Sequence, residues 1–213
     1  MTFSLREATL EDQAILEGLI AESARGLSRQ DYTDEQIEAA LHGAMGVDTQ
    51  LIRDGTYFVV EAEGEIVACG GWSRRKTLFG ADSHAARQSE LLDPAHDAAR
   101  IRAFFVRPAW ARQGIGRALL ERCEAEARAA GFRSAELMAT LPGWRLYKAM
   151  GYEGETRIAY DLGGGITIEF VPMRKEWECG VGRSGGVDGV RDHAPCVGRG
   201  IRGDECRGTR RAV

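Results

Sequence analysis

The clearest alternation of apolar and polar positions lies in residues 100–150. A β-prone run at residues 101–106 ends before Pro108, and a second β-prone run follows at residues 134–139. Between the two runs, apolar residues recur at every fourth position, as they do on one face of a helix: Ile115, Leu119, Cys123 and Ala127. Gly131 supplies the stop for this helix. The pattern therefore predicts a strand, a glycine-containing loop, a helix and a second strand.

The residues before this unit predict two helices and three strands. We expect a first strand at residues 3–8, then a helix that Thr9 caps and Gly26 ends. Thr33, followed three positions later by a glutamine, is the N-cap signature of a second helix that runs through Leu41. Two β-prone runs separated by a short glycine turn then predict a hairpin of strands, at residues 56–61 and 66–72.

The residues after the central unit predict one more helix, two more strands and then a change of composition. Thr140 caps a short helix at residues 144–150, and strands follow at residues 152–161 and 166–173. After Lys175 the chain is rich in glycine and arginine and has no periodic apolar residues. We therefore expect a folded domain at residues 1–175 and a tail at residues 176–213 that cannot bury enough apolar surface to fold. A basic arm for acidic partners, a disordered appendage and an out-of-frame extension are the alternatives for this tail.

Composition and charge argue against several classes of function. The formal net charge of −4 over 213 residues gives no reason to expect a nucleic-acid partner. No apolar run reaches the length of a membrane span, and the first residues lack the pattern of a signal peptide, so we expect a cytoplasmic protein with no membrane partner. The five cysteines contain no C-x-x-C pair, which argues against a disulfide framework and against a metal site.

The loop before the central helix has the chemistry of an anion site. Gly114 and Gly116 let the backbone approach a ligand closely, and the first N–H groups of a helix have no partners within the helix. The helix dipole and the side chains of Arg112 and Arg117 add positive potential at the same place. Three interpretations remain open on these residues: a structural turn, a dinucleotide fingerprint and a loop for the pyrophosphate of an acyl-CoA. The dinucleotide interpretation is the weakest, because Leu119 stands where the third glycine belongs.

Two motifs together resemble the GNAT superfamily of N-acetyltransferases. The first motif is VRPAWARQGIGRALL, and the second, at the usual distance downstream, is LYKAMGY. The loop pattern of the family is R/Q-x-x-G-x-G/A; Gly114 and Gly116 match it, whereas Ala111 stands at its first position. The resemblance implies an α/β (α+β) fold with a mixed, mostly antiparallel sheet of about six to seven strands and about four flanking helices. It also implies transfer of an acetyl group from acetyl-CoA to an amine without a covalent enzyme intermediate or a metal.

The same resemblance implies which residues of this chain hold acetyl-CoA. The backbone of two strand residues would pair with the pantetheine arm and offer an N–H group to the thioester oxygen, and the backbone of the loop would hold the pyrophosphate. The residues are Phe105 and Val106 on the strand, and Arg112, Gln113, Gly114, Ile115, Gly116 and Arg117 on the loop.

Tyr147 matches the tyrosine that protonates the departing thiolate in this family, although a purely packing role is the alternative. No glutamate occurs on the strand where many relatives carry their general base; Glu90, Asp93 and His96 are candidates by position in the sequence alone. We expect a small-molecule amine or a protein amino group as the acceptor, with a homodimer as one option for assembly. The alternative function is a non-catalytic module that binds and senses an acyl-CoA.

Overall fold

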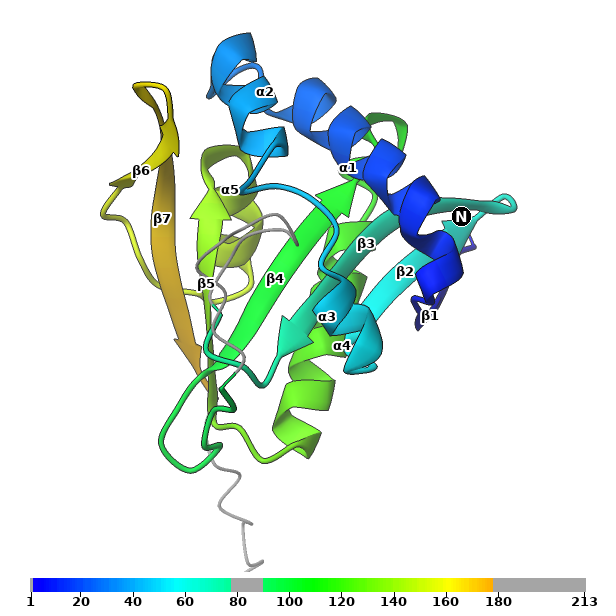
Figure 1. Ribbon diagram of the computed structural model, residues 1–213. Helices are drawn as coiled ribbons and strands as arrows, with labels where there is room; N and C mark the ends of the chain where they lie inside the picture. Colours follow the sequence, from blue (N-terminus) through cyan, green and yellow to red (C-terminus); the bar gives the residue numbers. More distant parts are fainter. Residues whose placement is uncertain (1, 78–89, 178–213) are drawn as a thin grey trace, which may run out of the picture. The chain divides into compact units, whose positions relative to one another are not determined.

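A seven-stranded sheet organises the computed structural model, which describes residues 2–77 and 90–177 (Figure 1). The spatial order of the strands is β1-β2-β3-β4-β5-β7-β6, and every neighbouring pair is antiparallel except β4 and β5. The prediction of a mixed, mostly antiparallel sheet is confirmed. The strands are β1 (Ser4–Glu7), β2 (Tyr57–Ala62), β3 (Glu65–Ser73), β4 (Ala99–Val106), β5 (Ser134–Thr140), β6 (Ile158–Gly163) and β7 (Ile166–Glu176).

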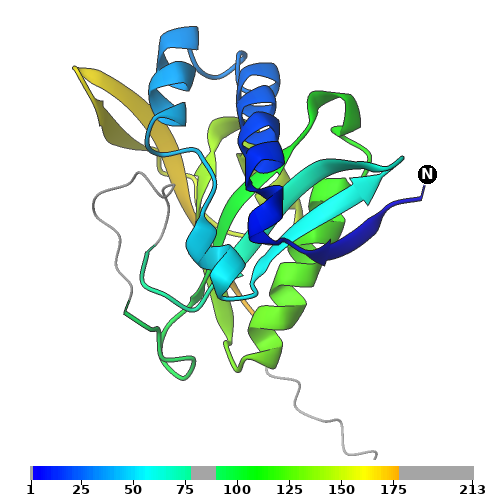
Figure 2. The same ribbon diagram turned by 45° about the vertical axis from the view of Figure 1, so that its right-hand side comes forward.

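Helices cover both faces of this sheet, with α1, α2 and α3 on one face and α4 and α5 on the other (Figures 1 and 2). The α-helices are α1 (Gln13–Leu27), α2 (Asp34–Leu41), α3 (Thr49–Arg53), α4 (Ile115–Ala129) and α5 (Leu141–Ala149). Two short 3₁₀ helices, η1 (Leu10–Asp12) and η2 (Pro108–Trp110), precede α1 and the loop before α4. Where the structure describes the chain, no helix combines the length and apolarity that crossing a membrane requires.

The core follows from the two-residue period of the central strands. On β2, Phe58 and Val60 belong to the buried cluster that contains α4, whereas Tyr57 and Val59 belong to the cluster that contains α1. Both sets of side chains are fully buried. Strands that are apolar on both faces need a helix layer on each side, and α1 and α4 provide these layers.

Helix α1 continues past the glycine that we expected to end it. Gly26 lies inside α1, which ends at Leu27. A Cβ atom at Gly26 would lie 2.3 Å from Cγ of Pro108, so a side chain here would collide with the residue that begins η2. This glycine therefore permits close packing between α1 and the chain after β4, and its cost to the helix is small because it stands one residue from the end.

Two other differences from the sequence prediction are local. The short helix α3 was not predicted; Asp48 caps it by accepting a hydrogen bond from the Gln50 N–H at 3.1 Å. The strand predicted at residues 152–161 is paired continuously only from Ile158. Before it, Gly154 adopts φ 149°, and a Cβ atom added there would collide with the Pro172 carbonyl. His84 and the tail from residue 178 on lie outside the described residues.

Candidate active site

The main cavity opens where two parallel strands separate. β4 and β5 pair only at their first residues, Ala99 with Ala135 and Arg100 with Glu136, and then diverge (Figure 1). The gap is a cavity of about 840 Å³, whose walls come from the end of β4, the loop before α4, α5, β7 and the C-terminal half of α1. A cleft of this size fits a ligand that enters between two strands and lies along one of them.

A bulge in β4 shapes the floor of this cavity. Ala103 has φ 54°, and the pairing of β3 with β4 shifts register between Cys69 and Gly71. The Tyr57 hydroxyl donates a hydrogen bond to the Ala103 carbonyl at 3.2 Å and so supports the distorted backbone. A bulge bends its strand and turns the following residues toward a new direction. The adjacent residues Ile101 to Val106 all line the cavity.

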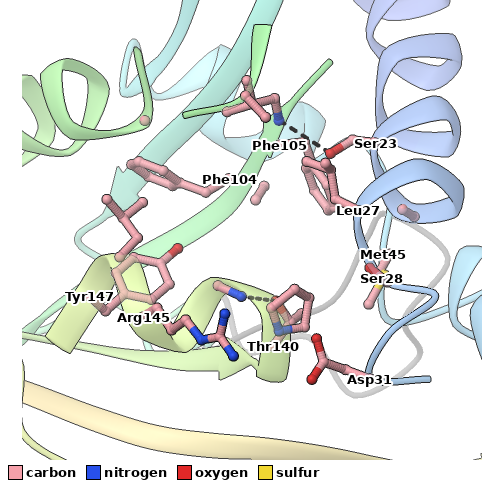
Figure 3. Close-up of a pocket in the computed structure, with 18 of the residues that line it drawn as sticks. Ser23, Leu27, Ser28, Asp31, Met45, Phe104, Phe105, Thr140, Arg145 and Tyr147 are labelled. Atoms are coloured by element: carbon pink, nitrogen blue, oxygen red, sulfur yellow. Dashed lines mark hydrogen bonds between the residues drawn. The ribbon is translucent and has the colours of Figure 1, made fainter. Parts of the chain in front are cut away.

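The end of β4 presents one backbone N–H group on the cavity side. The Arg107 N–H donates to the Val67 carbonyl of β3 at 2.8 Å, so the neighbouring N–H of Val106 points away from β3. The Val106 N–H instead donates to Oγ of Ser23 on α1 at 3.2 Å (Figure 3). By the same alternation the backbone of Phe105, which is paired with Cys69, faces β3. The alternation therefore favours Val106 over Phe105 as a backbone partner for a ligand in the cleft.

The glycine loop lies at one end of the same cavity. Arg112 and Gly114 have φ values of 65° and 82°, and Gly114 is the N-cap of α4. The first intrahelical bond runs from the Ala118 N–H to the Gly114 carbonyl, which leaves the preceding N–H groups without a partner in the helix. Four of the six predicted loop residues line the cavity: Arg112, Gly114, Gly116 and Arg117.

The other two loop residues have side chains directed elsewhere. Ile115 is buried in the core, and the Gln113 amide donates to the Ala109 carbonyl at 3.0 Å. Their predicted contact with a ligand involves the backbone alone. Arg117 forms an ion pair with Glu121 at 2.9 Å, so Arg112 supplies the loop's unpaired guanidinium, as far as the described residues show.

Tyr147 lies on α5 with its hydroxyl directed into the cavity (Figure 3). Its ring packs edge-on against Phe104 and Tyr152, with centroid distances of 6.3 and 5.9 Å, and the residue is 8% exposed. Burial raises the pKa of the Tyr147 hydroxyl above its ordinary value, so the group stays protonated at neutral pH. Within the described part of the chain, this hydroxyl makes no hydrogen bond.

Two residues fix the start of the helix that carries Tyr147. Thr140 caps α5 by accepting a hydrogen bond from the Gly143 N–H at 3.3 Å. The Tyr32 hydroxyl accepts a second one from the Leu141 N–H at 2.8 Å and donates to the Glu169 carbonyl on β7 at 2.6 Å. Tyr32 therefore joins the loop after α1 to both walls of the cavity.

The cavity also contains a carboxylate that sequence reasoning missed. Asp31, in the loop between α1 and α2, is the single acidic side chain among the described residues that line the cavity (Figure 3). The three candidates suggested by position in the sequence, Glu90, Asp93 and His96, do not line it. Glu90 pairs with Lys76 at 2.7 Å, and Asp93 caps its own turn through the Ala95 N–H at 2.9 Å.

Neither Asp31 nor Ser23 carries a sequence signal of its position in the cavity. Both lie on surfaces that meet the cavity only because α1 crosses β4 and Tyr32 ties the following loop to β7. In the described residues we also find no group of three or more His, Cys, Asp or Glu side chains that could hold a metal ion.

Comparisons with known proteins agree with this fold. The profile of the acetyltransferase (GNAT) family matches residues 21–152. A search of curated proteins gave no match. Solved structures with the same fold include a GCN5-related N-acetyltransferase from Rhodopseudomonas palustris, at 19% identity and a TM-score of 0.61 over 83% of this chain and 96% of that one.

Two further solved structures contain coenzyme A or acetyl-CoA. PaiA N-acetyltransferase from Thermoplasma acidophilum, in complex with coenzyme A, is 14% identical with a TM-score of 0.57 over 83% of this chain and 100% of that one. YncA from Salmonella typhimurium, a putative acetyltransferase solved with acetyl-CoA, is 16% identical with a TM-score of 0.55 over 84% of this chain and 95% of that one. At these identities the likeness establishes the fold.

Proposed function

Because the chain belongs to the acetyltransferase (GNAT) family, we propose that it transfers the acetyl group of acetyl-CoA to a primary amine by direct attack. One observation carries the proposal: a single cavity joins the glycine loop, the Val106 N–H and the Tyr147 hydroxyl. These are the three groups that the reaction needs for the phosphates, the thioester oxygen and the departing sulfur. PaiA and YncA, which share the fold, were solved with coenzyme A and acetyl-CoA.

In this proposal the cofactor lies along the gap between β4 and β5. The pyrophosphate accepts hydrogen bonds from the N–H groups of residues 112–117, where the positive end of the α4 dipole and Arg112 add attraction. The pantetheine arm then follows the free side of β4 and brings the thioester to Val106. Beyond Arg100, β4 pairs with no strand on this side in the described part of the chain, so an extended ligand can take the place of a neighbouring strand.

The chemical step follows from these positions. The lone pair of a neutral amine attacks the thioester carbon, and negative charge on the thioester oxygen is stabilised by the Val106 N–H. The carbon–sulfur bond then breaks, the sulfur takes the proton of the Tyr147 hydroxyl, and the nitrogen loses a proton to solvent. The acetylated amine and free coenzyme A leave, and the tyrosinate regains its proton from water.

The raised pKa of Tyr147 is compatible with its role as the acid. In water a tyrosine of pKa about 10 and a thiol of about 8.5 differ by roughly 2 kcal/mol in the unfavourable direction. The burial that disfavours the tyrosinate also disfavours a thiolate released at the same place, so the two pKa values rise together. Burial therefore acts on both groups in the same direction, which limits how far it widens the gap between their pKa values.

The acceptor side must bind an amine that is mainly charged in solution. A lysine-like amine pays about 4.6 kcal/mol to become neutral at pH 7. The Asp31 carboxylate attracts the ammonium form of the amine into the cavity, and apolar residues that line the same cavity favour the neutral form: Met45, Phe105, Met138 and Phe170. A small apolar amine or the amino group of a protein fits this description.

A panel of amines tests the proposal against the alternative of a non-catalytic acyl-CoA sensor. The protein is mixed with acetyl-CoA and each amine, and the release of free thiol is followed. Turnover with at least one amine, at a rate proportional to the protein concentration, supports the transferase. Tight binding of acetyl-CoA with no thiol release from any amine would favour the sensor.

A further inference from the structure

Helix α1 is joined to three consecutive residues at the end of β4. The Ser23 hydroxyl meets Val106, Glu22 forms an ion pair with Arg107, and Gly26 packs against Pro108. The Arg107 guanidinium also donates to the Ile66 carbonyl at 2.9 Å, which ties the same point to β3. These contacts fix both the height and the rotation of α1 over the cavity. The position of the Ser23 hydroxyl is therefore built into the packing.

The Ser23 hydroxyl can donate one hydrogen bond in addition to the one that it accepts. Ser23 is 5% exposed and lines the cavity, and its oxygen accepts the Val106 N–H at 3.2 Å. A hydroxyl carries one hydrogen of its own and rotates it toward an acceptor. Within the described residues, this hydrogen has no acceptor. A buried donor beside a ligand cleft gains most when the ligand supplies that acceptor.

The geometry around Val106 puts a bound thioester oxygen in reach of this hydrogen. An oxygen that accepts the Val106 N–H stands about 2.9 Å from the nitrogen, and Oγ of Ser23 stands at 3.2 Å from the same nitrogen. When two oxygens share one N–H in this way, with the lines to them about 60° apart, they are about 3 Å from each other. That is the length of a hydrogen bond from the serine to the thioester oxygen.

We propose that Ser23 is a further catalytic residue, whose hydroxyl donates the second hydrogen bond to the thioester oxygen beside the Val106 N–H. The inference rests on the proposed acetyl transfer. As the amine attacks, negative charge grows on this oxygen, and the hydrogen bonds from both donors become stronger. Before the cofactor binds, the same hydroxyl accepts the Val106 N–H and keeps it pointing into the cleft.

The test compares the parent protein with Ser23→Ala, which removes the hydroxyl, and Ser23→Thr, which keeps one. The vibration of the labelled carbonyl of bound acetyl-CoA is measured by isotope-edited infrared spectroscopy, since each hydrogen bond to a carbonyl lowers its stretching frequency. We expect the band to move toward higher frequency in Ser23→Ala and to return toward the parent value in Ser23→Thr. We also expect kcat to fall on the order of 10²-fold in Ser23→Ala. The affinity for coenzyme A should change little, because coenzyme A lacks the thioester carbonyl.

The infrared measurement needs no acceptor amine, so it separates this inference from the proposed function. An unchanged carbonyl band in Ser23→Ala would overturn the role of Ser23 and leave acetyl transfer intact. Equal losses of kcat and of coenzyme A affinity in both variants would also overturn it, because they would indicate a packing role in α1. Failure of the parent protein to bind acetyl-CoA would instead reject the proposed function.

Discussion

Replacing Tyr147 with phenylalanine removes one hydroxyl and leaves the ring in place. The ring packs between Phe104 and Tyr152, and these contacts do not involve the oxygen. In the described part of the chain the hydroxyl makes no hydrogen bond, so the free energy of unfolding should change by less than about 1 kcal/mol. The variant therefore removes the hydroxyl proton and keeps the packing of the ring.

The expected effect on turnover is large. Loss of a general acid lowers the rate by about 10²- to 10⁴-fold, which corresponds to about 3–5 kcal/mol in the activation free energy. The KM for acetyl-CoA should change little, because the proposed phosphate contacts lie at the loop before α4. In the parent protein, the raised pKa of Tyr147 should keep the acid protonated, so its ionisation should not lower kcat below about pH 10.

The assay is thiol release from acetyl-CoA under conditions where chemistry limits the rate, together with a thermal melt. Tyr152→Phe is the matched control: Tyr152 packs against the same ring, is 2% exposed and does not line the cavity. We expect this control to keep its rate within about threefold of the parent. If Tyr147→Phe also stayed within threefold, the general-acid role would be wrong.

Substitutions at three further positions test other parts of the site and the fold. Gly116→Asp should abolish the rise in Tm that acetyl-CoA causes, since it adds a negative charge at the proposed anion site, whereas the neutral Gly116→Asn should bind acetyl-CoA more tightly than Gly116→Asp. An added Cβ stands 3.2 Å from Cδ2 of Leu146, the end of a flexible side chain that can shift by a few tenths of an ångström, so both variants should fold. Asp31→Asn should raise the KM for a cationic amine and leave that for acetyl-CoA unchanged, and equal shifts in both would argue against a role in binding the amine. Asp48→Asn should destabilise the protein by about 3–5 kcal/mol in urea denaturation, because it leaves buried Arg102 without the carboxylate that it contacts at 2.6 Å; a loss below 1 kcal/mol would contradict this.

The sequence predicted the elements that local chemistry determines. Thr33 and Gln36 form the expected capping box, with hydrogen bonds of 3.2 and 2.9 Å, and α2 begins where it was predicted. The central helix was predicted from its apolar periodicity and from the glycine that ends it, and the strands beside it were predicted from their β-prone runs. Four of the six expected loop residues and Tyr147 line one cavity, although their roles stay predictions.

What the sequence could not predict depends on contacts between distant segments. Gly26 has the local pattern of a helix stop, and its function in packing becomes clear only beside Pro108, 82 positions later. Asp31 and Ser23 reach the cavity through the crossing of α1 over β4, which no periodicity within either segment reveals. The general-base candidates failed for the same reason, because closeness in sequence to β4 did not bring Glu90, Asp93 or His96 to the cleft.

A single-turnover experiment tests the central claim of direct acetyl transfer most directly. The protein is first mixed with a less than equimolar amount of labelled acetyl-CoA, so that all of the acetyl-CoA is bound, and then with an amine selected from the panel. Quenched samples are followed by mass spectrometry of both the amine and the intact protein. The account predicts that acetylated amine appears at the rate at which thiol is released, while the mass of the protein never increases. An acetylated protein that forms first and then passes its label to the amine would contradict direct transfer, and so would thiol release without any acetylated amine.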